Sequence, residues 1–152
     1  VQGGGQRAVA EPPVAGAGDR RGSECVLVVD DEPLVRDLLM QILANAGYRA
    51  VVAPDGQLAI DKVASGGGDI ALAIVDLTMP GMNGVQVMEA LHALRPGLPV
   101  LLSSGFSPAS LPGAAHGAAG FLSKPYGTDQ LLAAVRAALD GVARAGGLPH
   151  DR

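Results

Sequence analysis

Short apolar runs alternate with longer segments of helical periodicity through the middle of the chain. The runs are rich in valine, leucine and isoleucine and contain few polar positions, which is typical of strands buried on both faces of a parallel sheet. They predict five strands, at residues 24–30, 48–52, 70–75, 98–102 and 119–122. The segments between them predict helices at residues 33–46, 55–64, 85–94 and 128–139.

The first predicted helix has the clearest amphipathic pattern. Pro33 suits its first turn, and Gly47 suits its end. Between these limits apolar residues recur every three or four positions, and we expect this stripe to face the sheet. The stripe consists of Leu34, Leu38, Leu39, Ile42 and Leu43.

The segment between the fourth and fifth strands has the weakest helical pattern. Residues 107–118 contain Pro108, Pro112, Gly113 and Gly117. Proline and glycine are the poorest helix formers, so this fourth helix should be short, irregular or mobile. Repeated strand–helix units imply a parallel sheet with helices on both faces. We therefore expect an α/β fold, a flavodoxin-like (βα)5 three-layer sandwich with strand order 2-1-3-4-5.

The two ends of the 152-residue chain differ from its middle. Residues 1–23 are rich in glycine, alanine, proline and charge and lack periodicity, and residues 141–152 are similar. Such segments bury too little apolar surface to offset their ordering entropy. We expect a disordered linker at 1–23, one domain at 24–140 and a flexible tail at 141–152.

Chemically versatile residues stand where the predicted strands end. Asp30 ends the first strand and Asp31 follows it, Asp76 follows the third, Ser104 follows the fourth, and Lys124 follows the fifth. The carboxyl ends of parallel strands share one edge of a sheet, where ligands bind in open α/β folds. Three carboxylates, a hydroxyl and an ammonium at one edge suit a divalent cation and a phosphoryl group.

The cation that best fits this set is Mg²⁺ (or Mn²⁺). Clustered carboxylates repel one another unless a cation compensates them, and Mg²⁺ prefers oxygen ligands. The set contains no histidine or cysteine, which disfavours zinc and copper. Beside such a cation Asp76 could act as a nucleophile towards phosphorus and form an acyl phosphate, while Lys124 neutralises charge.

Each residue also has a simpler interpretation. A pair of aspartates before a helix often serves as a cap or turn, and a single aspartate at a strand end is more often a cap than a nucleophile. Lys124-Pro125 alone is uninformative. The functional interpretation is favoured because the residues stand at the carboxyl ends of several predicted strands together.

At these residues the chain resembles the receiver domain of two-component response regulators (the CheY-like superfamily). The resemblance covers about residues 25–140. The matching segments are VLVVDDEPLVRDLL, VDLTMPGMNG, PVLLSSGFS and GFLSKPY. It implies that Asp76 is the phosphoacceptor in a phosphorelay. It also implies that Mg²⁺ binds Asp30, Asp31, Asp76 and the backbone carbonyl of Thr78.

The resemblance assigns further roles. It implies that Ser104 is the switch hydroxyl, that Phe121 is the switch aromatic, that Lys124 contacts the phosphoryl group, and that Pro125 follows a cis peptide bond. Phe121 lacks the hydroxyl of a tyrosine, so packing alone would hold it inward. In the family, helix four, strand five and helix five form the usual output or dimer surface. The broken fourth helix of this chain departs from that pattern. Thr78 and Phe106 offer little to orient a hydrolytic water, so we expect a long-lived phosphoryl group.

The implied partner is a histidine kinase or a histidine phosphotransfer protein. The exposed side of the first helix is the expected docking face, with Arg36, Asp37 and Gln41. A transmitter histidine normally lies on an exposed helix and is followed by an acidic residue. No histidine of the chain meets both conditions, since only the one in the predicted tail precedes an acid, so we place all three on the surface or at its rim: His92, His116 and His150. Oligomeric state should be monomer or weak dimer.

Composition narrows the class of protein further. The formal net charge is −4, which argues against direct binding to nucleic acid. Cys25 is the single cysteine, so no disulfide framework exists, and a small core residue is expected there. No apolar stretch approaches the roughly 20 residues of a membrane span, and no signal peptide is visible. We expect a cytoplasmic domain whose parent protein could be membrane-anchored.

Several alternatives remain open. A haloacid-dehalogenase-like phosphatase also uses an aspartate nucleophile and Mg²⁺, but it carries a second catalytic aspartate where this chain has Thr78. A nucleotide-binding Rossmann module would need glycines where Asp31-Glu32 stands. A pseudo-receiver would act only as an interaction module. For the parent protein, the start at Val1 and the LLSSGFS run favour the C-terminal receiver of a hybrid sensor kinase, ahead of a stand-alone regulator and a DNA-binding regulator.

Overall fold

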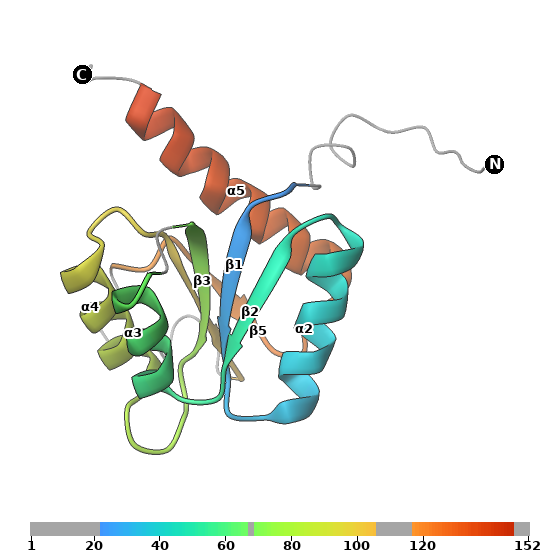
Figure 1. The fold of residues 1–152 in the computed structure, drawn as a ribbon. Coiled ribbons are helices and arrows are strands. Elements are labelled where there is room, and N and C mark those ends of the chain that lie inside the picture. The colour runs from blue at the N-terminus through green and yellow to red at the C-terminus, as the bar shows by residue number, and fades with distance from the viewer. Residues whose placement is uncertain (1–21, 67–68, 106–116, 148–152) are drawn as a thin grey trace.

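The computed structural model describes residues 22–66, 69–105 and 117–147, with side chains up to residue 141. Its centre is a five-stranded parallel sheet with the order β2-β1-β3-β4-β5 (Figure 1). The elements in chain order are β1 (Cys25–Val29), α2 (Pro33–Asn45), β2 (Arg49–Ala53), α3 (Gly56–Ala64), β3 (Ile70–Asp76), α4 (Gly84–Leu94), β4 (Val100–Ser104), β5 (Gly120–Ser123) and α5 (Thr128–Gly147). The predicted fold class and strand order are confirmed.

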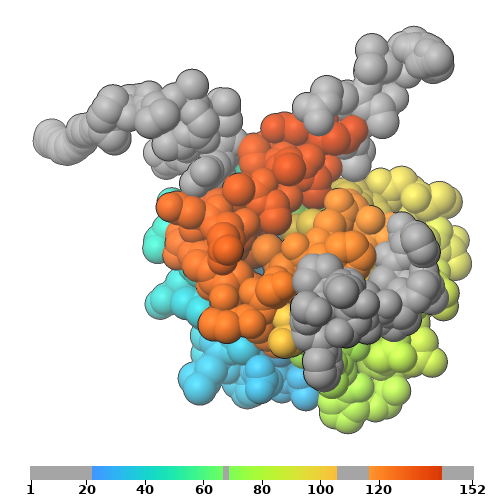
Figure 2. Space-filling model, turned by 180° about the vertical axis from the view of Figure 1, so that it is seen from behind, coloured from blue at the N-terminus to red at the C-terminus, as the bar shows by residue number. Residues whose placement is uncertain are grey.

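Helices cover both faces of the sheet, so the domain has three layers. α3 and α4 lie on one face, and α2 and α5 lie on the other (Figure 1). From behind, α5 lies across the surface beside α2 (Figure 2). Successive strand residues point to opposite faces, so Leu27 and Val29 pack towards α3 and α4, whereas Val26 and Val28 pack towards α2 and α5. This double burial explains the continuous apolar runs.

The helices on the α3 and α4 face begin at side-chain caps. The Asp55 carboxylate accepts a hydrogen bond from the Leu58 amide at 2.8 Å. Asn83 and Gln86 form a reciprocal capping box at the start of α4. Such caps satisfy amides that have no partner within the helix. They fix where α3 and α4 begin after the carboxyl ends of β2 and β3.

The predicted stripe of α2 is wrong at its first two residues. Leu39, Ile42 and Leu43 are buried as expected, but Leu34 is 83% exposed and Leu38 is 50% exposed. A row of residues spaced by four drifts by about 40° per step around a helix of 3.6 residues per turn. The row that begins at Leu34 therefore starts outside the buried face and reaches it only at Ile42.

The last helix is longer than predicted. α5 continues to Gly147, whereas the sequence pattern ended it at Leu139 and made 141–152 a flexible tail. Residues 143–145 are Ala-Arg-Ala, which are good helix formers and can sustain the helix past Gly141. β4 also starts two residues late, because Leu98 and Pro99 complete the turn after α4 and proline cannot donate to a strand ladder.

Several predictions fall outside the described residues. They concern the linker up to residue 21, most of the irregular fourth helix, the tail beyond residue 147, and the residues Phe106, His116 and His150. Two others are confirmed: Cys25 is buried in the core, and the Lys124–Pro125 peptide bond is cis.

Candidate functional site

Three carboxylates meet at the edge where the parallel strands end. Asp30 follows β1, Asp76 ends β3, and these two strands are hydrogen-bonded neighbours. Asp30, Asp31 and Asp76 each offer a carboxylate oxygen, and these atoms lie within 4.8 Å of one another. Asp30 is 2% exposed and Asp76 is 6% exposed, whereas Asp31 faces solvent. The structure thus brings all three predicted side-chain ligands together.

Lys124 reaches the same place from the end of β5. Its Nζ lies 3.2 Å from Asp30 Oδ2 and 3.6 Å from Asp76 Oδ2. It also lies 3.7 Å from Glu32 Oε1, a contact that sequence analysis did not anticipate. A 2.7 Å hydrogen bond from the Lys124 amide to the Ser104 carbonyl holds its backbone. We refer to Asp30, Asp31, Asp76 and Lys124 as the acidic site.

The charges of the acidic site do not balance. Burial raises the pKa of Asp76 from 3.8 to about 6, the Asp30 carboxylate adds to this rise, and the Lys124 ammonium opposes it. Burial lowers the pKa of Lys124, but Asp30 and Asp76 outweigh it, so this pKa lies above its ordinary value. An additional cation would favour ionised Asp76. The donor set is entirely oxygen, which fits Mg²⁺.

The loop after β3 is held tightly around Asp76. The Thr78 amide donates to Asp76 Oδ1 at 3.3 Å, and the Leu77 amide donates to the Ser103 carbonyl at 2.7 Å. Gly84, the first residue of α4, donates to the Leu77 carbonyl at 2.9 Å. A Cβ on Gly84 would lie 2.6 Å from the backbone carbonyl oxygen of Asp76 and 2.6 Å from Leu77 Cα. Only glycine therefore lets α4 begin this close to the loop.

Ser104 and Phe121 lie on neighbouring strands near the acidic site. Ser104 is buried at the end of β4, and its strand pairs with β5 in register, Leu102 opposite Phe121. The Phe121 ring is 41% exposed, so it points outward in this structure. The predicted Thr78 carbonyl ligand stays a prediction.

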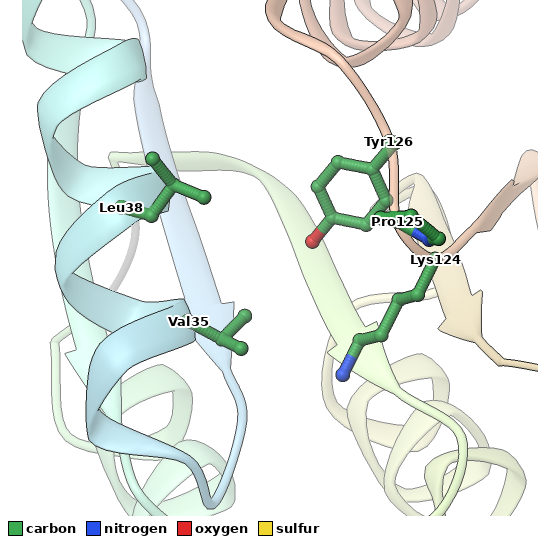
Figure 3. A pocket seen from close by; sticks show the side chains of 5 residues that line it. All are labelled: Val35, Leu38, Lys124, Pro125 and Tyr126. Carbon is green, nitrogen blue, oxygen red and sulfur yellow. The ribbon is translucent and has the colours of Figure 1, made fainter.

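An apolar pocket of about 360 Å³ adjoins Lys124. Val35 and Leu38 project into it from α2, and Pro125 and Tyr126 face them from the segment after β5 (Figure 3). Together with exposed Leu34 it gives α2 an apolar rim beside the acidic site. Sequence analysis missed this rim because it placed Leu34 and Leu38 in the core.

The structure also gives the burial and the hydrogen-bond partners of Arg36 and His92. Arg36 is half-buried and donates to the Asp30 carbonyl, so it turns towards the acidic site rather than presenting a fully exposed docking group. His92 is half-buried and lies 3.0 Å from the Leu98 carbonyl through Nε2. The rim position predicted for His92 is confirmed. None of the helices in the described part of the chain has the length and apolar character that crossing a membrane requires.

Comparison with known proteins identifies the family and the fold of the chain. The family model described as response regulator receiver domain matches residues 26–136. The response regulator MprA of Mycolicibacterium vanbaalenii is 35% identical over 116 residues, which cover 75% of this chain and 49% of that protein. The sensory transduction protein RegX3 of Mycobacterium tuberculosis is 36% identical, with 75% and 50% covered. The chain spans about half the length of these curated relatives.

Solved structures agree. A CheY-like receiver domain protein from Methanospirillum hungatei has a TM-score of 0.75 and 26% identity, covering 82% of this chain and all of that one. The response regulator protein TrrA from Thermotoga maritima, in complex with Mg²⁺-BeF, has a TM-score of 0.68 and 30% identity, covering 74% and 96%. With the sheet order and the acidic cluster, these matches show that the chain belongs to the response regulator receiver domain family.

Proposed function

We propose that this receiver domain accepts a phosphoryl group on Asp76 in a reaction that depends on Mg²⁺ and on a partner histidine kinase or histidine phosphotransfer protein. The observation that carries the proposal is the geometry of the acidic site. Three carboxylate oxygens lie within 4.8 Å of one another, and a single ammonium contacts two of the carboxylates. The TrrA structure contains Mg²⁺-BeF, which supports the same kind of ligand here.

Phosphoryl transfer requires little covalent chemistry from the protein. An Asp76 carboxylate oxygen bonds to phosphorus while the bond from phosphorus to the donor's imidazole nitrogen breaks, leaving an acyl phosphate and a neutral imidazole. Lys124 Nζ turns from Asp30 and Asp76 towards the phosphoryl oxygens. Asp30 and Asp31 hold the cation together with Asp76 and the Thr78 carbonyl. Bound Mg²⁺ would supply charge neutralisation at the phosphoryl oxygens.

The proposal is tested with acetyl phosphate as the donor. We expect intact-mass spectrometry of the wild type with Mg²⁺ to show the mass increase of one phosphoryl group, and chelation of the metal to abolish it. Asp76→Asn keeps the size of the side chain and should remain unmodified. Phosphorylation of that variant, or none of the wild type under any divalent cation, would overturn the proposal. A domain that binds no Mg²⁺ would instead be a pseudo-receiver.

The conformational response would pass through Ser104 and Phe121. A phosphoryl group adds about −1.5 to −2 charges, which draws the Ser104 hydroxyl and Lys124 towards Asp76. Movement of Ser104 opens space into which the outward Phe121 ring could turn, held by packing alone. The free-energy gap between such states need be only a few kcal/mol. The exposed position of Phe121 supports this proposal, since it leaves the ring an inward turn to make.

The α2 rim is the proposed docking surface for the phosphodonor. Leu34 and Leu38 are exposed apolar side chains, and the pocket lined by Val35, Leu38 and Tyr126 borders Lys124 (Figure 3). A partner helix packed on this rim would place its phosphohistidine beside Asp76. Exposed apolar patches of this kind mark protein–protein contacts. The docking face we propose is therefore more apolar than Arg36, Asp37 and Gln41 alone would make it.

The lifetime of the phosphoryl group and the parent context complete the proposal. Thr78 is exposed beside Asp76 and carries only a hydroxyl, so we expect slow hydrolysis of the acyl phosphate. A half-life of seconds for purified protein with Mg²⁺ would contradict this.

We propose that the parent protein is a hybrid sensor kinase and that this receiver domain lies in the cytoplasm. Phosphotransfer profiling against candidate kinases, with the full gene sequence, tests that assignment.

A further inference from the structure

Asp30 is held by a partner on each of its polar groups. Its amide donates to the Ala53 carbonyl at 3.2 Å, and its Oδ1 accepts from the Glu32 amide at 2.9 Å. Its Oδ2 accepts from Lys124 Nζ at 3.2 Å. The fourth group, the backbone carbonyl, accepts from Arg36 Nη1 at 2.7 Å. This last bond links the turn that carries Asp30 and Asp31 to the body of α2.

The position of Arg36 in α2 is unfavourable for a cation. It lies close to the helix start at Pro33, where the macrodipole is positive, and the first turn holds no acidic residue to offset it. The cap residue Glu32 makes no side-chain capping bond either. The helix macrodipole therefore gives no reason for an arginine here. The short bond to the Asp30 carbonyl does give one.

Arg36 has two opposite effects on a cation at the acidic site. Its positive charge repels the cation, so removing that charge alone would strengthen binding. Its hydrogen bond fixes the chain at Asp30, so losing that bond would let two ligands drift and would weaken binding. Partners that orient metal ligands change metal affinity by about 10–100-fold when they are removed. We expect the geometric effect to exceed the repulsion, because Arg36 is only half-buried and solvent screens its charge.

We propose that Arg36 is a positioning residue for the divalent cation, because its guanidinium fixes the Asp30 carbonyl and thereby the pair Asp30–Asp31. This inference rests on the proposed function. It goes beyond that function because Arg36 is not one of the proposed metal ligands. We expect it to contribute to metal affinity all the same, through its bond to the Asp30 carbonyl. Arg36 thereby connects the proposed docking helix to the acidic site.

The test is a Mg²⁺ titration by isothermal calorimetry, well above pH 6 so that Asp76 is ionised. We expect Arg36→Met to raise the Mg²⁺ dissociation constant about tenfold or more. Arg36→Lys keeps a donor and a charge and should restore part of the affinity. Arg49→Met is the matched control, because Arg49 is exposed and paired with Asp69 away from the site. It should leave the dissociation constant unchanged.

A second readout separates positioning from general damage. Phosphorylation of Arg36→Met by acetyl phosphate should return to the wild-type rate at saturating Mg²⁺, which a damaged fold would not allow. If Arg36→Met does not fold, Arg36→Leu, which also lacks a charge and a donor, takes its place in both measurements. Unchanged or tighter Mg²⁺ binding in the neutral variant would overturn this inference alone. Absence of Mg²⁺ binding by the wild type would overturn the proposed function as well.

Discussion

Charged residues gather at both edges of the sheet, but in opposite ways. At the amino edge Arg136 of α5 bonds to Glu24 at 2.9 Å, to Asp140 at 3.0 Å and to the Tyr48 hydroxyl at 3.2 Å. The Arg136 guanidinium holds the pKa of Glu24 below its usual value, and the pKa of Arg136 is raised by Glu24. At the carboxyl edge the pKa of Asp76 rises instead, to about 6. At the amino edge one guanidinium bonds to both of its acidic partners and stabilises the fold. The acidic site instead gathers three carboxylates around one ammonium and is left to bind something else.

Asp76→Asn should stabilise the metal-free domain, by up to about 3 kcal/mol at neutral pH. The folded pKa of about 6 exceeds the ordinary 3.8, so folding disfavours the ionised carboxylate. Stability of the wild type therefore falls as pH rises from 3.8 to about 6, and the advantage of the variant should vanish below that window. Urea unfolding at several pH values measures this. A variant less stable than the wild type at neutral pH would contradict the unbalanced-charge interpretation.

Arg136→Met should do the opposite at the amino edge. It leaves Glu24 and Asp140 without their cation, so we expect the free energy of unfolding to fall by about 2 kcal/mol. Phosphorylation by acetyl phosphate should be unchanged, since Arg136 bonds to Glu24 and Tyr48 at the opposite edge of the sheet from the acidic site. Thermal or urea unfolding and intact-mass spectrometry check the two parts. A loss of phosphorylation in a folded variant would erase the distinction between the edges.

Leu38→Glu should separate docking from chemistry at the carboxyl edge. Phosphotransfer from the kinase that reacts fastest in profiling should slow about tenfold, which corresponds to about 1.4 kcal/mol. Phosphorylation by acetyl phosphate should remain as in the wild type. Leu58→Glu is the matched control, because Leu58 is 43% exposed on α3, against 50% for Leu38. Equal slowing in both variants would remove the case for the α2 rim.

Ser104→Ala should give the smallest effect. It leaves the acidic site intact, so phosphorylation should proceed, and stability should change by about 1 kcal/mol or less. The NMR shift changes that beryllofluoride induces around Phe121 should shrink relative to the wild type. If the wild type responds strongly and the variant responds identically, Ser104 is not the coupling residue.

The sequence predicted the parts of the molecule that depend on local pattern and parallel topology. Asp30, Asp76 and Lys124 could be brought together because the carboxyl ends of the parallel strands meet at one edge of the sheet. The exposure of Leu34 and Leu38 could not be seen, because it depends on how α2 is rotated about its axis against the sheet. The Arg36 bond to Asp30 depends on the same rotation. The helical residues after Gly141 were missed because their glycines outweighed the intervening alanines in the pattern.

A crystal structure of the domain with Mg²⁺ and beryllofluoride tests most directly whether the acidic site binds the metal and a phosphoryl group on Asp76. We expect beryllium on one Asp76 oxygen, the metal on Asp30, Asp31, the other Asp76 oxygen and the Thr78 carbonyl, and Lys124 Nζ moved onto a fluorine. A structure in which Lys124 keeps its 3.2 Å contact with Asp30 while the ions lie elsewhere would contradict this expectation.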